Sequence, residues 1–330
     1  AIASNVAAVK IGETATVTFT FSEAPSGFAA GDVVTTGGTL SDPVVTADPK
    51  VYTATFTPTP GTASGNASIT VAAGSYADAA GNNGGAGATP AISIDTLAPT
   101  LAITSNDAAL KIGETATITF TFSEAPVGFA ADDVVTTGGT LSDPVVTADP
   151  KVYTATFTPT PGTASGNASI TVAAGLFADA AGNTGGAGAS PSVSIDTVAP
   201  TITLNPITGD NIIGVTEYTG AVVVSGTTTG AEDGQTVTVH LNGQDYTASV
   251  ASNVWTLTVP SAHIGVLTDH ATYAVTADVS DQAGNPAVQA SQNVLIAATG
   301  PVITINAISG DDFINAAEHF EKGKRQNQLT

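Results

Sequence analysis

Hydrophobic and polar residues alternate along much of this chain. In residues 115–122 the hydrophobic side chains occupy every second position, and threonines fill the positions between them. The hydrophobic positions are Ala116, Ile118, Phe120 and Phe122. Because successive side chains of a β-strand point to opposite faces, this period of two predicts a strand with one buried and one exposed face.

The same alternation returns at residues 153–157 and 168–172, with Thr and Ser on the outward face. Turn-forming pairs such as Gly138-Gly139 and Asp143-Pro144 separate these runs. The spacing indicates about seven short strands per hundred residues, and no segment shows a helical period. We therefore predict an all-β fold of tandem immunoglobulin-like antiparallel β-sandwich domains, arranged as beads on a string. The Cys and Trp hallmarks of antibody domains are missing, so the prediction concerns architecture only.

The chain contains a long internal repeat. Residues 10–95 recur at 111–196 with an offset of 101 positions, and only nine of the 86 aligned residues differ. A period of this length suits a whole small β domain. Residues 197–298 read as a divergent relative, and 301–318 resemble 200–217 at the same offset. We predict sandwich domains over 1–95, 96–196 and 197–298, with 299–330 forming the incomplete start of a fourth repeat and a basic tail.

Composition narrows the possible functions. The chain has 28 acidic and seven basic residues, and residues 197–298 contain no Lys or Arg. Nucleic-acid binding depends on cationic contacts with phosphates, so no nucleic-acid partner is expected. No apolar run is long enough to span a membrane, so direct membrane insertion is not expected either. The absence of Cys excludes disulfides, thiolate metal sites and Cys nucleophiles.

Four stretches resemble the bacterial Ig-like repeats of large surface adhesins and biofilm-associated proteins of the RTX type. They are the linkers Ser-Ile-Asp-Thr-Leu-Ala-Pro-Thr (93–100) and Ser-Ile-Asp-Thr-Val-Ala-Pro-Thr (194–201), the run Gly-Glu-Thr-Ala-Thr-Ile-Thr-Phe-Thr-Phe-Ser-Glu (113–124), and Asp-Ala-Ala-Gly-Asn (179–183). The resemblance implies a structural segment of a secreted, cell-surface protein. The absence of Met, and of a lead-in like residues 96–100 before the first domain, agrees with a fragment whose partners are neighbouring repeats of a longer chain.

Acidic residues gather where two predicted domains meet. In an Ig-like sandwich the entering linker, the loop between the second and third strands and the loop between the last two strands share one pole. The first junction would collect Asp95, Glu124, Asp133, Asp179 and Asn183, and the second Asp196, Asp233, Asp281 and Asn285. All of these offer oxygen ligands, which Ca²⁺ prefers and Zn²⁺ does not. We predict Ca²⁺ at these junctions, with dissociation constants of about 10⁻⁴ to 10⁻³ M as in extracellular modules.

Two alternatives to these metal sites stay open. The same residues are good turn formers, since Asp-Ala-Ala-Gly-Asn suits an Asx turn. At the third junction Ala297 stands where Asp196 would be, so that junction is metal-free or uses Asp311 and Asp312 instead.

Catalytic motifs are missing from the sequence. No nucleophile elbow, phosphate loop or dinucleotide fingerprint occurs, and aromatic residues make up only 5% of the chain, too few for a sugar-binding cleft. The four histidines show no metal-binding spacing and are expected on strands or the surface. Trp255 lies in an alternating run and is expected in a core. We therefore predict that the chain is not an enzyme.

Together these features predict the extender, or stalk, of a secreted bacterial adhesin, which holds a distal binding domain away from the cell and is stiffened by Ca²⁺. A glycan- or protein-binding Ig-like module is one alternative. A subunit that self-associates into an extracellular filament by strand exchange is another, and an accessory region of a secreted enzyme is a third.

Overall fold

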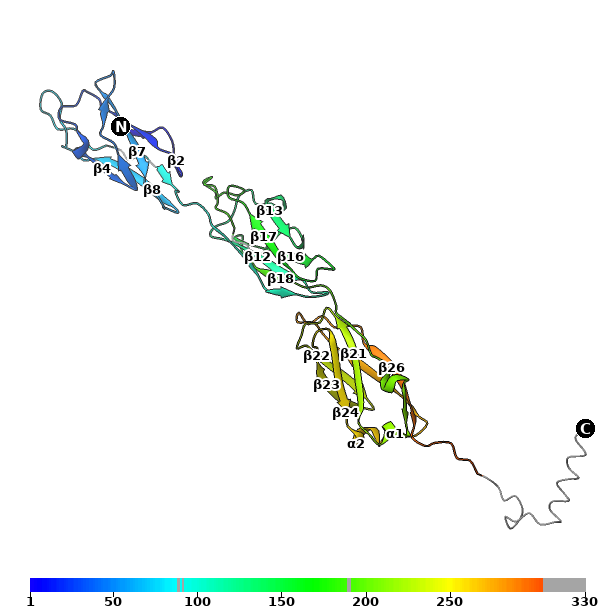
Figure 1. Ribbon diagram of the computed structural model, residues 1–330. Helices are drawn as coiled ribbons and strands as arrows, with labels where there is room; N and C mark the ends of the chain where they lie inside the picture. Colours follow the sequence, from blue (N-terminus) through cyan, green and yellow to red (C-terminus); the bar gives the residue numbers. More distant parts are fainter. Residues whose placement is uncertain (88–89, 91, 189–190, 305–330) are drawn as a thin grey trace, which may run out of the picture. The chain divides into compact units, whose positions relative to one another are not determined.

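The computed structural model describes residues 1–87, 90, 92–188 and 191–304. It is an all-β protein of tandem immunoglobulin-like domains (Figure 1). The sheets of the described residues enclose three separate hydrophobic cores. The chain divides into two compact units, Ala1–Val198 and the residues from Ala199 onward. Within the first compact unit, we call residues 1–95 repeat 1 and residues 96–196 repeat 2. We call residues 197–298, the third predicted domain, unit 3. Most of the predicted start of a fourth repeat and basic tail, namely residues 305–330 with Asp311 and Asp312, falls outside the described residues.

Repeat 1 is a sandwich of two sheets. One sheet has the order β1-β3-β7-β5, with β6 also paired to β7, and the other has the order β2-β9-β8-β4. The strands are β1 (Ile2–Ser4), β2 (Ala8–Val9), β3 (Ala15–Thr20), β4 (Val33–Thr36), β5 (Gly38–Leu40), β6 (Val44–Val45), β7 (Val51–Pro58), β8 (Gly65–Val71) and β9 (Ile92–Ile94). A single 3₁₀ turn, η1 (Ala30–Asp32), leads into β4.

Repeat 2 has the same topology, with sheets β10-β12-β16-β14, joined by β15, and β11-β18-β17-β13. Its strands are β10 (Leu101–Ser105), β11 (Ala109–Leu110), β12 (Ala116–Phe122), β13 (Val134–Thr137), β14 (Gly139–Leu141), β15 (Val145–Val146), β16 (Val152–Pro159), β17 (Gly166–Val172) and β18 (Val193–Ile195). The 3₁₀ turn η2 (Ala131–Asp133) corresponds to η1.

The predicted alternation of β12 is confirmed. Its hydrophobic residues, from Ala116 to Phe122, are at most 2% exposed, and they face the core of repeat 2. Among the described residues, each of these repeats has nine strands rather than about seven, because strands of two residues such as β2 and β6 are too short to show a period in the sequence.

Unit 3 pairs the sheet β19-β21-β24 with the sheet β20-β26-β25-β22-β23. Its strands are β19 (Thr201–Ile202), β20 (Ile212–Gly214), β21 (Val222–Thr229), β22 (Thr236–Leu241), β23 (Gln244–Ser249), β24 (Val254–Val259), β25 (Thr272–Asp278) and β26 (Ala290–Ala297). The expected core position of Trp255 is confirmed, at 2% exposed.

Unit 3 also contains helical turns that the sequence did not indicate. These are η3 (Ile207–Gly209), α1 (Val215–Tyr218) and α2 (Ser261–Ile264). A helix of four residues completes only about one turn, so its 3.6-residue period cannot repeat in the sequence. None of the helices in the described part of the chain has the length and hydrophobicity that a membrane crossing requires.

Candidate metal centre

The Asp-Ala-Ala-Gly-Asn segment of repeat 2 forms a closed turn in the long connection between β17 and β18. Asp179 N–H donates to the Asn183 carbonyl at 3.1 Å, and Gly182 N–H donates to the Asp179 carbonyl at 3.2 Å. Gly182 has φ of +86°, a left-handed conformation that glycine adopts without a steric penalty. The Asp179 carboxylate accepts the backbone N–H of Asn183 at 2.8 Å and its side-chain amide at 2.7 Å. The turn-forming property noted in the sequence is therefore real, and it fixes the direction of a carboxylate.

Two further carboxylates meet Asp179 at this turn. Asp95 follows the last strand of repeat 1, and Glu124 lies just after β12 of repeat 2. Asp95, Glu124 and Asp179 each supply an oxygen atom, and the three oxygens lie within 4.8 Å of one another. Three elements far apart in sequence thus bring negative charge to one point at the junction of the two repeats.

The surroundings oppose ionisation of Glu124. Partial burial raises the pKa of its carboxyl group, and the neighbouring charges of Asp179 and Asp95 raise that pKa further. Like charges held this close together favour either uptake of a proton or binding of a cation. The donor set consists of carboxylate oxygens, which are the ligands of hard cations such as Ca²⁺.

The side chain of Asn183 is hydrogen-bonded to other protein groups and is not free to act as a metal ligand. Its side-chain amide N–H groups donate to the Asp95 carbonyl at 3.1 Å, and to the Asp95 carboxylate at 3.3 Å. Its Oδ1 accepts the backbone N–H of Ile11 from repeat 1 at 2.8 Å. The side chain is only 2% exposed, so Asn183 joins the two repeats and orients two of the carboxylates.

Asp133 was expected in this group but lies elsewhere. Its Oδ2 accepts the backbone N–H of Ala130 at 2.7 Å and so caps the 3₁₀ turn η2. The three mutually close acidic residues do not include it. The sequence placed Asp133 in the right loop, but the local turn uses its carboxylate.

Lys10 of repeat 1 contacts the turn of repeat 2, although the sequence analysis assigned Lys10 no role in a site. Its Nζ donates to the carbonyl oxygen of Gly182 at 3.1 Å, beside the candidate metal centre. Because Lys10 and Gly182 are 172 positions apart, no local spacing could have indicated this contact.

The equivalent turn of repeat 1 is formed but not covered. Asp78 accepts the backbone N–H of Asn82 at 2.9 Å and its side-chain amide at 2.7 Å, as in repeat 2. Asn82 is exposed, whereas Asn183 is buried. The same sequence therefore forms the same turn, and burial comes from the neighbouring segment.

Unit 3 has its own copy of the turn. Asp281 accepts the backbone N–H of Asn285 at 2.8 Å and its side-chain amide at 2.9 Å, and both residues are buried. Glu232 accepts the N–H of Gln282 at 2.7 Å, while Asp233 accepts the N–H of Ser252 at 2.7 Å. Within unit 3, Glu232 thus contacts the turn, and Asp233 binds a different loop. The predicted second site, which also requires Asp196 from the other unit, stays a prediction.

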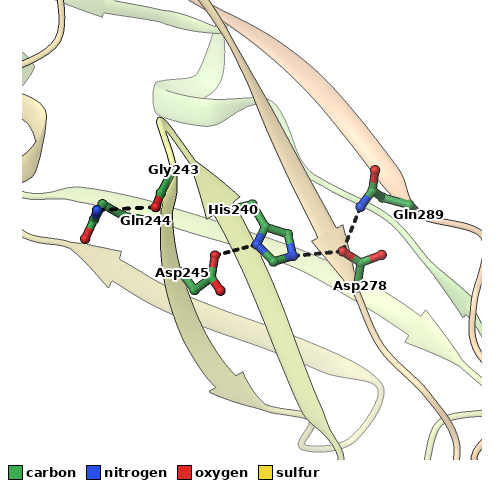
Figure 2. A network of polar contacts seen from close by, with 6 residues as sticks. All are labelled: His240, Gly243, Gln244, Asp245, Asp278 and Gln289. Atoms are coloured by element: carbon green, nitrogen blue, oxygen red, sulfur yellow. Dashed lines mark hydrogen bonds and ion pairs between the residues drawn. The ribbon is translucent and has the colours of Figure 1, made fainter.

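His240 of β22 lies in a polar network on the surface of unit 3 (Figure 2). Its Nδ1 is 2.6 Å from the Asp245 carboxylate and its Nε2 is 3.1 Å from the Asp278 carboxylate. Gln289 donates to the same Asp278 oxygen at 2.8 Å. The carboxylates lie on opposite sides of the ring, as Figure 2 shows, so the network does not converge on a single point as metal ligands do. The hydrogen bond with Asp245 and the charges of Asp245 and Asp278 raise the pKa of His240.

Solved structures that are similar to this chain include domains of bacterial adhesins. One similar structure comes from a 1.5-MDa bacterial ice-binding adhesin, at 22% identity and a TM-score of 0.38, covering 90% of this chain and 97% of the other. Another is a Ca²⁺-stabilised adhesin of an Antarctic bacterium, at 25% identity and a TM-score of 0.37, covering 96% and 79%. A third is a bacterial immunoglobulin-like domain of the M. primoryensis ice-binding adhesin, at 35% identity and a TM-score of 0.24, covering 29% and 95%.

A search of curated protein sequences finds no match to the chain. Protein-family comparison, in contrast, identifies both of the near-identical repeats. Residues 1–94 and 95–197 each match the bacterial Ig-like domain, and the chain therefore belongs to the bacterial Ig-like domain family.

Proposed function

We propose that this chain is an extender segment of a secreted bacterial surface adhesin, in which Ca²⁺ stiffens the junction between tandem repeats. Membership of the bacterial Ig-like family supports the extender role, as does the near-identity of the two repeats, loops included. A recognition module needs loops that differ in shape and chemistry, whereas a spacer needs only repeated length. In this proposal the chain acts outside the cell, has no enzymatic activity and holds a distal binding domain away from the surface.

The observation that carries the Ca²⁺ proposal is the meeting of Asp95, Glu124 and Asp179 within 4.8 Å. Asp95 belongs to the linker, whereas Glu124 and Asp179 belong to loops of repeat 2. Without a cation, the mutual repulsion of three carboxylates favours movement of the linker away from the loops. A bound divalent cation would replace this repulsion by attraction, and the linker would lose freedom to bend.

The chain itself prepares this site. Asn183 holds Asp95 and Asp179 through its amide hydrogens, while Lys10 and Ile11 bind the turn from the side of repeat 1. These contacts need no metal, so they position the carboxylates before an ion arrives. Pre-positioned ligands lower the entropic cost of binding.

The test is a calorimetric titration of the chain with Ca²⁺, together with thermal melts and small-angle X-ray scattering in Ca²⁺ and in excess chelator. We expect Ca²⁺ binding in the submillimolar to millimolar range. At a concentration 100-fold above the dissociation constant, binding should stabilise the folded form by about 2.7 kcal/mol. Scattering should show reduced bending between repeats 1 and 2.

Asp179→Asn and Asp78→Asn form a matched pair for this test. Both remove a carboxylate from the same turn sequence, but only Asp179 belongs to the group of three. Asp179→Asn should abolish the Ca²⁺-dependent stabilisation of the junction, and Asp78→Asn should keep it. An unchanged melt and an unchanged scattering profile for the unmodified chain in Ca²⁺ would show that these residues are turn formers only.

A further inference from the structure

One flank of each repeat ends in open sheet edges. In repeat 1 the strand β4 lies at the end of the sheet β2-β9-β8-β4, and β5 and β6 lie at the end of the other sheet (Figure 1). The backbone groups on the outer side of a terminal strand have no ladder partner within their own sheet. Val33, Thr35 and Leu40 line a groove of about 240 Å³ between β4 and β5. This flank is therefore accessible to another chain.

Hydrophobic side chains are exposed along the same flank in both repeats. Val34 of β4 is 61% exposed, and its equivalent in β13, Val135, is 60% exposed. Both residues of β6 and both residues of β15 are also exposed valines. A cluster of exposed hydrophobic side chains beside unpaired backbone groups favours contact with a further strand.

The edge strands carry no charge, although the chain has 28 acidic residues. Their sequences are Val-Val-Thr-Thr in β4, Gly-Thr-Leu in β5 and Val-Val in β6. Natural proteins commonly place charged residues on exposed edges, because charge there prevents pairing with another chain. Identical copies bring like side chains together, and like charges directly opposite each other destabilise a strand pair. An uncharged edge therefore suits a second copy of the same chain in particular.

We propose that β4 and β13 are self-association surfaces, through which two copies of this chain pair edge to edge as antiparallel strands. The two strands have the same Val-Val-Thr-Thr sequence, so each can pair with either edge of the second copy. Only four residues pair at each edge, so the contact is weak and reversible, with a dissociation constant of about 10⁻⁴ to 10⁻³ M. This inference goes beyond the stalk function and does not rest on Ca²⁺.

The pattern of β4 fixes the register of such a pair. Side chains directly opposite each other must lie on the same face of the sheet, and a two-fold pair centred on Val34 meets this condition. Val33 then lies opposite Thr35 of the second copy, and Asp32, which directly precedes β4, lies opposite Thr36. The two Asp32 carboxylates do not face each other, whereas the two exposed Val34 side chains cover each other.

The first test is sedimentation velocity of the full 330-residue chain in excess chelator, from about 0.01 to 1 mM, which spans the expected dissociation constant. The sedimentation coefficient should rise with concentration. Val34→Lys combined with Val135→Lys places like charges opposite each other at every pair of edges and should abolish this rise. Thr55→Lys combined with Thr156→Lys adds the same charge on the exposed faces of the central strands β7 and β16 and should leave it unchanged.

The second test is disulfide cross-linking, for which the chain is suited because it contains no Cys. Directly opposite residues of antiparallel strands have Cα atoms about 4.5 to 5.5 Å apart, and a disulfide accepts about 4.4 to 6.8 Å. Val34→Cys, in a chain that also carries Val135→Lys, should therefore form covalent dimers under mild oxidation. Dimers should form roughly tenfold faster than with Thr55→Cys in the same background, because pairing raises the effective concentration of the thiols.

The substituted residues Val34, Thr55, Val135 and Thr156 are all exposed, so the variants should keep their cores, which thermal melts verify. A sedimentation coefficient that is independent of concentration would overturn the proposal. Association that persists in the Val34→Lys and Val135→Lys chain, or equal cross-linking of the two cysteine variants, would also overturn it. Failure of Ca²⁺ to bind would overturn only the metal centre.

Discussion

The backbone N–H of Ile11 donates to the side-chain oxygen of Asn183 at 2.8 Å, across 172 positions of sequence. The amide nitrogen of the same Asn183 side chain binds the carboxylates of Asp95 and Asp179. One amide group therefore connects repeat 1, the linker and the turn of repeat 2. Because a buried polar group without a partner is destabilising, these bonds favour a single arrangement of the junction.

Replacing Asn183 by alanine should open this junction locally. The change leaves the Ile11 N–H without its acceptor, and we expect the hydrogen exchange of the Ile11 amide to accelerate by roughly tenfold or more, equivalent to about 1.4 kcal/mol. Exchange measured residue by residue with nuclear magnetic resonance checks this. Asn82→Ala is the control, since it breaks the equivalent turn of repeat 1, whose Asn is exposed. Equal protection of Ile11 in both variants would contradict the bridging role.

Glu124 should make the metal-free junction sensitive to pH. Its pKa in the folded chain is raised above the usual 4.5 by burial and by Asp179 and Asp95. A raised pKa means that the folded state binds the proton more tightly than the unfolded state. The corresponding stability is present below pH 4.5 and is lost as the pH rises through the folded pKa.

Carbon-detected titration of the Glu124 carboxyl group in chelator should show this raised pKa, and addition of Ca²⁺ should lower it. Glu124→Gln should flatten the pH dependence of unfolding in chelator and remove the response to Ca²⁺. Glu23→Gln, at the equivalent position of repeat 1, should change neither. A Glu124 titration unaffected by Ca²⁺ would contradict a role as ligand.

His240 should make unit 3 less stable in alkaline solution. Its pKa is raised above 6.5, first by the hydrogen bond with Asp245 and also by the charges of Asp245 and Asp278. The stabilising contribution is therefore fully present below pH 6.5 and is lost as the pH rises through the folded pKa. The ring lies between β23 and β25, so its protonated form attracts carboxylates on both neighbouring strands (Figure 2).

Trp255 is the only tryptophan of the chain, so its fluorescence reports selectively on unit 3. Urea unfolding followed at this signal from pH 5.5 to 8.5 should show a falling midpoint, and His240→Gln should flatten the curve. His263→Gln is the control, because His263 contacts the Tyr246 hydroxyl and no carboxylate in the hydrogen bonds described. A pH dependence that persists in His240→Gln would contradict the assignment.

Gly139 should not tolerate a side chain. A Cβ atom there would lie 2.2 Å from the carbonyl oxygen of Thr158 and 2.6 Å from the ring of Phe157. Gly139→Ala should therefore destabilise repeat 2 by about 1 to 3 kcal/mol, or more if the backbone cannot move. Gly186→Ala, where a Cβ would meet no atom within 4 Å, should be close to neutral. Comparison of their urea midpoints checks the packing, and equal midpoints would contradict it.

Much of the fold could be predicted from the sequence, because the alternation of hydrophobic and polar residues within a strand shows which of its side chains are buried. Ile118, Phe120 and Trp255 were placed in cores from alternation alone. The two-residue strands and the single helical turns could not be predicted, since so few residues cannot display a period. For the candidate site, Asp179 and Asn183 were recognisable as a turn, and Asp95 as part of a linker. The capping role of Asp133 was not, because it depends on the 3₁₀ turn that follows Ala130.

The sequence by itself determined that this protein is a β-rich array of repeated domains, with many acidic and few basic side chains. Alternation, a 101-residue period and composition are properties that can be counted along the chain. The tertiary structure decided which carboxylates meet, that Lys10 and Ile11 hold the turn of the next repeat, and that identical turns differ in burial. These relationships join residues up to 172 positions apart. Such distances are closed only by the packing of whole domains, for which no local pattern exists.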